Sequence, residues 1–324
     1  MPPKSNACIA VTLIRFEHAT GFWDGAAARV LDMLLARDVS RSPPAPEEPS
    51  MKPTLRQIQL PGRVRLEFAE QGGRSSTPVI ALHGVTDSWR SFEPVLSHLP
   101  SELRVMALTQ RGHGDSDKPA GGYRPADFAA DMAAFMDVME IERAVLVGHS
   151  MGSVNAMRFA IDHPSRVAGL LLAGTMPWFG RPPELMAYHR EQIVPLADPV
   201  PDAFARDFQQ STLARPIAAS MLERFVAESL KVPAHVWRAA FAGFIGDDFS
   251  PRLREIEVPT LIVWGRHDAF CSATDQEAML GQIRTARLVE YADAGHAMHW
   301  EEPQRFALDL SRFVTSVAVG AAIA

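Results

Sequence analysis

The sequence has few cysteines, only Cys8 and Cys271 in 324 residues. Two cysteines so far apart form neither a metal-binding spacing nor a disulfide framework, so we expect a reducing, cytoplasmic location. Basic residues are not in excess, and a net charge of -6 argues against a nucleic-acid partner. No apolar run approaches the length of a membrane span, and the short apolar segment 7–14 is not followed by a convincing signal-peptide cleavage site.

The first 53 residues differ in composition and pattern from the rest of the chain. Residues 1–53 are predicted to be an N-terminal arm, with an amphipathic helix over 24–37 and a linker rich in Pro, Ser and Glu over 42–53. The arm is either a loosely docked segment or a contact to a partner subunit, which leaves a homodimer open.

Short apolar segments alternate with helical segments from residue 54 onward, which predicts an α/β fold with a mainly parallel sheet and helices on both faces. Residues 54–175 and 252–324 are assigned to this core. Residues 176–251 interrupt the alternation, because they are helix-rich and carry many aromatic side chains. We interpret them as a helical cap inserted over the strand ends, with most aromatics in its own core and a minority lining a hydrophobic pocket.

A candidate nucleophile lies in the pattern Gly148-His149-Ser150-Met151-Gly152, which reads G-x-S-x-G. A strand is predicted before it at 144–147 and a helix after it at 153–163, and this strand–turn–helix context is what a nucleophile elbow requires. The two glycines remove side chains that would collide at the sharp turn. We therefore predict that Ser150 is the catalytic nucleophile.

A serine hydroxyl needs a base, and the base needs an orienting carboxylate. His296 follows the predicted strand 287–291, where the base should lie, and it is favoured over His299 one helical turn further on. Asp268 follows the predicted strand 260–264 and is favoured over Asp247 or Asp248, which precede that strand. The chain order Ser150, Asp268, His296 is the one that this type of fold uses.

Two backbone amides are expected to form the oxyanion hole. One belongs to Met151, directly after the serine, and the other to Val85, in the turn that follows His83-Gly84. No metal site is predicted. The candidates for substrate binding are Trp89, His149, Trp178, Phe241 and Trp300.

These motifs together resemble those of the α/β-hydrolase fold superfamily, of the capped serine esterase or lactonase type. The resemblance covers residues 54–318 and departs from the family pattern at Thr109 and Ser153, neither of which takes part in the chemistry. It implies hydrolysis through an acyl-enzyme without a cofactor. The motifs that carry it are His83-Gly84 with Trp89, Arg111-Gly112-His113-Gly114-Asp115-Ser116, the Ser150 pentapeptide, Gly265-Arg266-His267-Asp268, and Gly295-His296 with Glu301 and Pro303.

The leading functional hypothesis is a carboxylic ester hydrolase (EC 3.1.1 type) acting on a small-molecule ester or lactone. Serine at the elbow argues against the activities of the epoxide hydrolases and dehalogenases of this fold, which use an aspartate nucleophile. A carbon–carbon bond hydrolase remains an alternative, and it would need arginines facing the site, for which Arg158 and Arg190 are candidates. A ligand receptor that uses residues 1–50 to bind a partner is a third, less favoured hypothesis.

Overall fold

The computed structural model describes residues 52–73 and 77–323, and these belong to one compact unit that spans 50–324. The predicted arm helix over 24–37 and nearly all of the predicted linker lie outside the described residues.

An eight-stranded sheet forms the centre of the protein, in the order β1-β2-β4-β3-β5-β6-β7-β8. Strands β3 to β8 pair in parallel, whereas β1 and β2 form an antiparallel hairpin whose second strand pairs antiparallel to β4. The predicted mainly parallel sheet is therefore confirmed. The strands are β1 (Thr54–Gln59), β2 (Arg65–Gln71), β3 (Val79–Leu82), β4 (Val105–Thr109), β5 (Ala144–His149), β6 (Val167–Ala173), β7 (Thr260–Gly265) and β8 (Ala286–Tyr291).

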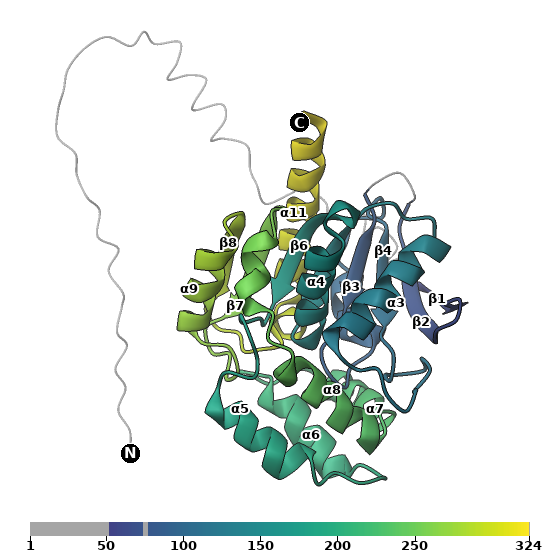
Figure 1. Ribbon diagram of the computed structural model, residues 1–324, viewed down its shortest axis with the longest axis vertical. Helices are drawn as coiled ribbons and strands as arrows, with labels where there is room; N and C mark the ends of the chain where they lie inside the picture. Colours follow the sequence, from purple (N-terminus) through teal and green to yellow (C-terminus); the bar gives the residue numbers. More distant parts are fainter. Residues whose placement is uncertain (1–51, 74–76, 324) are drawn as a thin grey trace, which may run out of the picture. The chain divides into compact units, whose positions relative to one another are not determined.

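Helices cover both faces of this sheet (Figure 1). The segments outside the β6–β7 connection are η2 (Trp89–Phe92), α2 (Glu93–Leu96), α3 (Pro125–Val138), α4 (Met151–Asp162), η3 (Pro164–Arg166), α9 (Ala273–Gln282), α10 (Met298–Glu301) and α11 (Pro303–Ile323). The closing helix, α11, continues past Val317 to Ile323.

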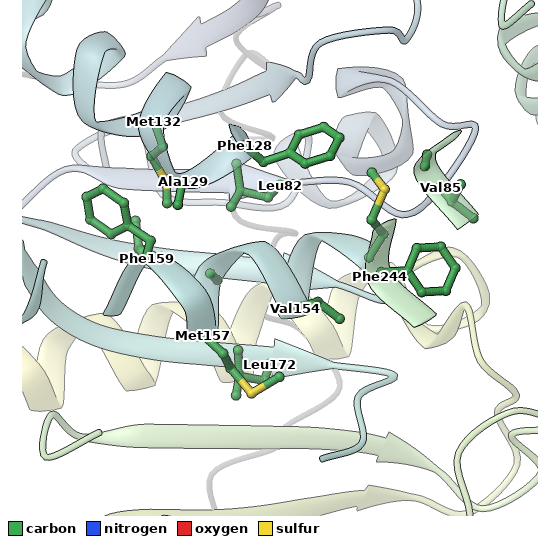
Figure 2. Packing of buried hydrophobic residues seen from close by; sticks show 14 of the residues in the cluster. Leu82, Val85, Phe128, Ala129, Met132, Val154, Met157, Phe159, Leu172 and Phe244 are labelled. Atoms are coloured by element: carbon green, nitrogen blue, oxygen red, sulfur yellow. The ribbon is translucent and has the colours of Figure 1, made fainter. Parts of the chain in front are cut away.

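Successive side chains of a strand point to opposite faces of the sheet, so the hydrophobic core has two parts. In β3, Ile80 and Leu82 face a cluster with α3 and α4, whereas Val79 and Ala81 face a second cluster with α2 and α11. A buried parallel strand can supply apolar side chains to both faces, which is why these strands read as continuous apolar runs. Figure 2 shows part of the first cluster, with the labelled residues Leu82, Phe128, Met132, Val154, Met157 and Leu172.

The connection between β6 and β7 is mostly helical, and we refer to it as the insertion. Its helices gather beside one end of the sheet (Figure 1) and contribute side chains to a cavity that also contains residues from the carboxyl ends of β3 and β5. Its segments are α5 (Pro183–Tyr188), η4 (His189–Ile193), α6 (Asp202–Ser211), α7 (Ala219–Leu230), α8 (Ala234–Gly246) and η5 (Ser250–Glu255).

Candidate active site

The turn at Ser150 is sharp and strained. Strand β5 ends at His149 and helix α4 begins at Met151, so the predicted strand–turn–helix context is present. Ser150 itself has φ 52° and ψ -120°, an uncommon conformation for a residue with a side chain. Close packing holds it there, because a Cβ on Gly152 would lie 2.1 Å from the carbonyl oxygen of Leu82. The space around this turn therefore admits only glycine at position 152.

His296 and Asp268 meet at the carboxyl ends of β7 and β8. His296 Nδ1 lies 2.9 Å from Asp268 Oδ2, and neither side chain is more than 5% exposed. The other carboxylate oxygen accepts from the amides of Phe270 and Cys271, at 2.8 and 3.0 Å. These two amides fix the orientation of the carboxylate. His296 Nδ1 must donate to it, which leaves Nε2 as the basic nitrogen.

Ser150 and His296 line the same cavity. Within the described residues no hydrogen bond joins the Ser150 hydroxyl to the imidazole. Such bonds are often long before substrate binds and tighten only in the reacting complex. The arrangement has the residue types and chain order for nucleophilic attack with a histidine base.

The alternative candidates for the base and for its orienting carboxylate make other contacts. His299 is fully buried, with Nε2 2.9 Å from the Ser91 hydroxyl, and burial lowers its pKa to about 3. Asp247 makes an ion pair with Arg158 at 3.1 Å. Neither competitor therefore has the contacts that the base or its orienting carboxylate requires.

Two amides are free to bind an oxyanion. The amide of Val85 donates to no other group in the described part of the chain, and Met151 is the first residue of α4, where a helix leaves its N–H groups unpaired. Val85 lines the cavity.

The turn that carries Val85 is held by hydrogen bonds to β4 and α4. Nε2 of His83 accepts from the amide of Gln110 at 2.9 Å, so Nδ1 carries the hydrogen and donates to the carbonyl oxygen of Gly84 at 2.7 Å. The Gln110 side chain donates to the carbonyl oxygen of His83 and accepts from Asn155 on α4, both at 2.8 Å. This network connects the Val85 turn to the helix that begins after Ser150.

The cavity itself is narrow, with about 30 Å³ of space open to water-sized groups. Its wall is mostly aromatic and aliphatic, and none of the described residues that line it is Lys or Arg. The insertion supplies about half of the wall. The lining residues are Gly84, Val85, Asp87, His149, Ser150, Phe179, Leu185, Phe208, Gln209, Thr212, Phe241, Phe244, Phe270, His296 and Trp300.

Three of the five predicted substrate-binding residues line this cavity: His149, Phe241 and Trp300. The other two do not. Trp89 packs into the second core cluster, with α2 and α11, and the Trp178 indole donates to the carbonyl oxygen of Ile245 at 2.8 Å.

A second, larger cavity of about 520 Å³ lies next to the first. Leu185 and Phe270 line both. The Phe270 ring lies 4.9 Å from the His296 ring, measured between centroids. These two side chains therefore separate the space around Ser150 from the larger cavity.

Asp87 is a lining residue that the sequence analysis did not identify. It is 4% exposed, and burial raises the pKa of its carboxyl to about 7. Its Oδ1 accepts from Gln209 Nε2 at 2.9 Å, and the same amide nitrogen also donates to the Ser229 hydroxyl at 2.7 Å. The Thr86 hydroxyl lies 3.1 Å from that of Ser229. Helices α6 and α7 are thus hydrogen-bonded to the turn that follows Val85.

One group of side chains could in principle hold a metal. Asp268, Cys271 and His296 place a ligand atom each within 4.8 Å of one another, the only such grouping in the ranges 52–73 and 77–323. Burial, reinforced by Asp268 and Asp275, raises the pKa of the Cys271 thiol well above its usual value. Since the thiolate is the metal-binding form, this group is a poor metal site.

No helix in the described residues is long and apolar enough to cross a bilayer.

The sheet, its covering helices, and a serine, an aspartate and a histidine after β5, β7 and β8 are the features of an enzyme of the hydrolase type. A family model of the alpha/beta hydrolase fold matches residues 77–303, and the chain belongs to this family.

The individual relatives are named for more than one activity. A putative 2-succinyl-6-hydroxy-2,4-cyclohexadiene-1-carboxylate synthase from Bacillus subtilis is 29% identical, covering 80% of this chain and 98% of the relative. A 2-hydroxy-6-oxononadienedioate/2-hydroxy-6-oxononatrienedioate hydrolase from Paraburkholderia xenovorans is 28% identical, covering 76% and 89%. An esterase from Exiguobacterium antarcticum has a similar structure, with a TM-score of 0.73 and 25% identity over 80% of this chain and 98% of that one.

Proposed function

We propose that this protein is a serine hydrolase that cleaves an uncharged carboxylic ester or lactone. The observation that carries the proposal is the cavity, which brings Ser150 and His296 together within a largely apolar wall without a cationic side chain. The similar esterase structure supports the same reading.

Ser150 acts as the nucleophile in the proposed reaction. Its Oγ attacks the carbonyl carbon while His296 Nε2 accepts the hydroxyl proton, and Asp268 stabilises the imidazolium through Nδ1. His296 then protonates the leaving oxygen, which releases the alcohol and leaves an acyl group on Ser150. Water, deprotonated by His296, attacks this acyl-enzyme, and the acid leaves as the serine is reprotonated.

The Val85 and Met151 amides are the proposed donors to the oxyanion in both steps. They are positioned before substrate binds, one by the hydrogen-bonded turn after β3 and the other by the start of α4. Donors fixed in this way need no reorganisation when the tetrahedral oxyanion forms, and each such donor is typically worth about 10²-fold or more in rate.

Hydrolysis of a carbon–carbon bond in an acidic substrate is the second candidate, because one relative is named for a dioate substrate. A carboxylate in this cavity would have no cation to pair with, and burying an unpaired charge is costly. Arg158 is paired with Asp162 and Asp247, and the exposed Arg190 is paired with Glu191. Neither arginine lines the cavity, which favours the uncharged ester.

The Ser150→Ala variant tests the proposal. We expect it to lose hydrolysis of p-nitrophenyl butyrate by about 10⁴-fold or more and to lose labelling by a fluorophosphonate probe. Ser153→Ala is the matched control, because Ser153 lies near the start of the same helix, where its hydroxyl donates to the carbonyl oxygen of Ser150 and is hydrogen-bonded to the Thr175 hydroxyl. Equal turnover by the Ser150→Ala variant and the unchanged protein contradicts the proposal. Rapid cleavage of an oxo-dienedioate with slow ester turnover favours the second candidate.

A further inference from the structure

The larger cavity offers much more room than the catalytic cavity, the one that contains Ser150. Its volume is about 520 Å³, against about 30 Å³. Helix α5 lines it with Leu185 and Tyr188, which are three residues apart and therefore share one face of the helix. The segment between β7 and α9 contributes Phe270, among others, and α5 lies below the ends of β7 and α9 in Figure 1. A substrate group too large for the catalytic cavity therefore has a neighbouring space to occupy.

Phe270 lies at the mouth of the catalytic cavity. The residues in the wall of that cavity are buried, with the exceptions of Ser150 and Phe270, which are partly exposed. Phe270 also belongs to the wall of the larger cavity, and Leu185 is the other side chain that both walls share among the described residues. The way from the larger cavity to the serine therefore passes between Phe270 and Leu185.

The side chain of Phe270 can be changed without removing a hydrogen bond of the proposed triad. Its backbone amide, and not its ring, donates to Asp268 Oδ1 at 2.8 Å. The ring itself lies 4.9 Å from the His296 ring, measured between centroids. A substitution of the side chain therefore keeps the bond that orients Asp268 and changes the space beside the imidazole.

The position of Phe270 beside His296 identifies the part of the ester that passes it. In the proposed reaction His296 protonates the leaving oxygen, so the alcohol part is bound next to the imidazole. The acyl part stays on Ser150 after the first step, whereas the alcohol must depart before water attacks. The ring that packs against His296 and lies at the mouth of the cavity is therefore next to the departing alcohol.

The wall of the larger cavity suits an uncharged group. Arg181 is its one basic residue among those that the structure describes, and it lies 3.7 Å from Asp275. Glu184 and Asp268 add two carboxylates to this wall. An anionic group would thus meet an excess of negative charge. The remaining wall is mostly apolar or aromatic, and it consists of Pro182, Pro183, Leu185, Tyr188, Ala269, Phe270 and the polar Ser272.

We propose that the larger cavity binds the alcohol part of the ester, and that Phe270 and Leu185 set the width of the alcohol that can reach Ser150. The preferred substrates are esters of uncharged alcohols with a slender apolar body. This inference rests on the proposed serine hydrolysis.

Two matched series of esters test the proposal, with hydrolysis followed by acid release. In one series the alcohol widens, from ethyl acetate to benzyl acetate and 2-naphthylmethyl acetate. In the other the acyl group widens by the same rings, from ethyl acetate to ethyl phenylacetate and ethyl 2-naphthylacetate. Phe270→Ala should raise kcat/KM for 2-naphthylmethyl acetate relative to ethyl acetate by about 10-fold or more, because it widens the passage. The corresponding ratio in the acyl series should change by less than about threefold.

Leu185→Ala widens the same passage from the insertion side and should shift the alcohol series in the same direction. It keeps the test decisive if Phe270→Ala does not fold. Phe204→Ala is the matched control, because Phe204 is also a partly buried phenylalanine but packs on Trp237, at 5.5 Å between centroids, and lines neither cavity. Its ratios in both series should match those of the unchanged protein.

Several outcomes overturn the inference while leaving the proposed hydrolysis intact. These are an alcohol series that neither Phe270→Ala nor Leu185→Ala alters, an acyl series that shifts as much as the alcohol series, and the same shift in Phe204→Ala. Faster turnover of an acetate whose alcohol ends in a carboxylate than of the same chain without it also contradicts the proposed class. Failure of the proposed hydrolysis looks different, since then no ester of either series is cleaved and the fluorophosphonate does not label Ser150.

Discussion

Gln209 on α6 donates a hydrogen bond of 2.9 Å to Asp87, although 122 residues separate them in sequence. Both are buried, and both line the cavity with Ser150. The bond connects the helical insertion to the turn that carries the Val85 amide. The position of the insertion and the geometry of the proposed oxyanion hole are therefore linked.

Removing this bond should weaken both stability and turnover. Gln209→Leu leaves Oδ1 of Asp87 without a donor and removes one hydrogen bond to the Ser229 hydroxyl, which should cost about 1 to 3 kcal/mol in the free energy of unfolding. Urea denaturation measures the first effect, and kcat for p-nitrophenyl butyrate the second. Gln210→Leu is the matched control, because its side chain is exposed and should leave both quantities nearly unchanged. Identical behaviour of the two variants would exclude a coupling between α6 and the Val85 turn.

Substitution of Asp268 tests how His296 is oriented. In Asp268→Asn the amide oxygen should keep accepting from Phe270 and Cys271, so the amide N–H₂ group faces His296 Nδ1. That nitrogen must then become an acceptor, which puts the hydrogen on Nε2 and removes the base. We expect kcat to fall by about 10³- to 10⁴-fold with little change in thermal stability. Asp293→Asn, at an exposed position on the same β8–α10 connection as His296, controls for loss of a carboxylate near the site. A loss below 10-fold would mean that Asp268 does not set the tautomer.

The sequence predicts those parts of the site that depend on local structure. Ser150 is recognisable because the strand, the tight turn and the helix are contiguous, and Asp268 and His296 are recognisable because each follows a strand of a parallel sheet. The sheet order then brings these strand ends together. The strand spans predicted at 144–147, 260–264 and 287–291 agree with β5, β7 and β8 to within about two residues, because buried strands appear in the sequence as apolar runs.

The rest of the site depends on how the insertion packs, which no local pattern encodes. Trp178 and Phe241 both read as insertion aromatics, yet the Trp178 indole turns to the carbonyl of Ile245 and Phe241 enters the cavity. Asp87 reads as an ordinary turn residue, because its hydrogen bond to Gln209 joins residues that are 122 positions apart in the sequence. Its position two residues after Val85 is the one available signal.

Substitution by alanine should have very different effects on stability at Gly152, in the turn after Ser150, and at Gly281. A Cβ at Gly152 would lie 2.1 Å from the backbone oxygen of Leu82, so Gly152→Ala should lower the free energy of unfolding by about 3 kcal/mol or more and abolish fluorophosphonate labelling. A Cβ at Gly281 would meet nothing within 4 Å, and this residue lies near the end of α9. Gly281→Ala should therefore be neutral or stabilising by up to about 1 kcal/mol. Thermal unfolding distinguishes the two, and a tolerated Gly152→Ala would contradict the close approach of α4 to β3.

Asp87 should also make the stability of the protein depend on pH. Its pKa is raised from 3.8 to about 7 in the folded state, mainly by burial, so between these pH values the folded protein holds a proton that the unfolded chain has lost. The unfolded state binds fewer protons there, and stability must fall as the pH rises through this window and level off above about 7. The full effect of one such group is at most about 4 kcal/mol. Asp87→Asn has no carboxyl to titrate at this position. The difference between its free energy of unfolding and that of the unchanged protein should therefore shift in favour of the variant by about 2 to 4 kcal/mol from pH 4.5 to pH 8. Urea denaturation at both pH values measures this difference, and parallel pH profiles for the two proteins would show that Asp87 is ionised in the folded state throughout.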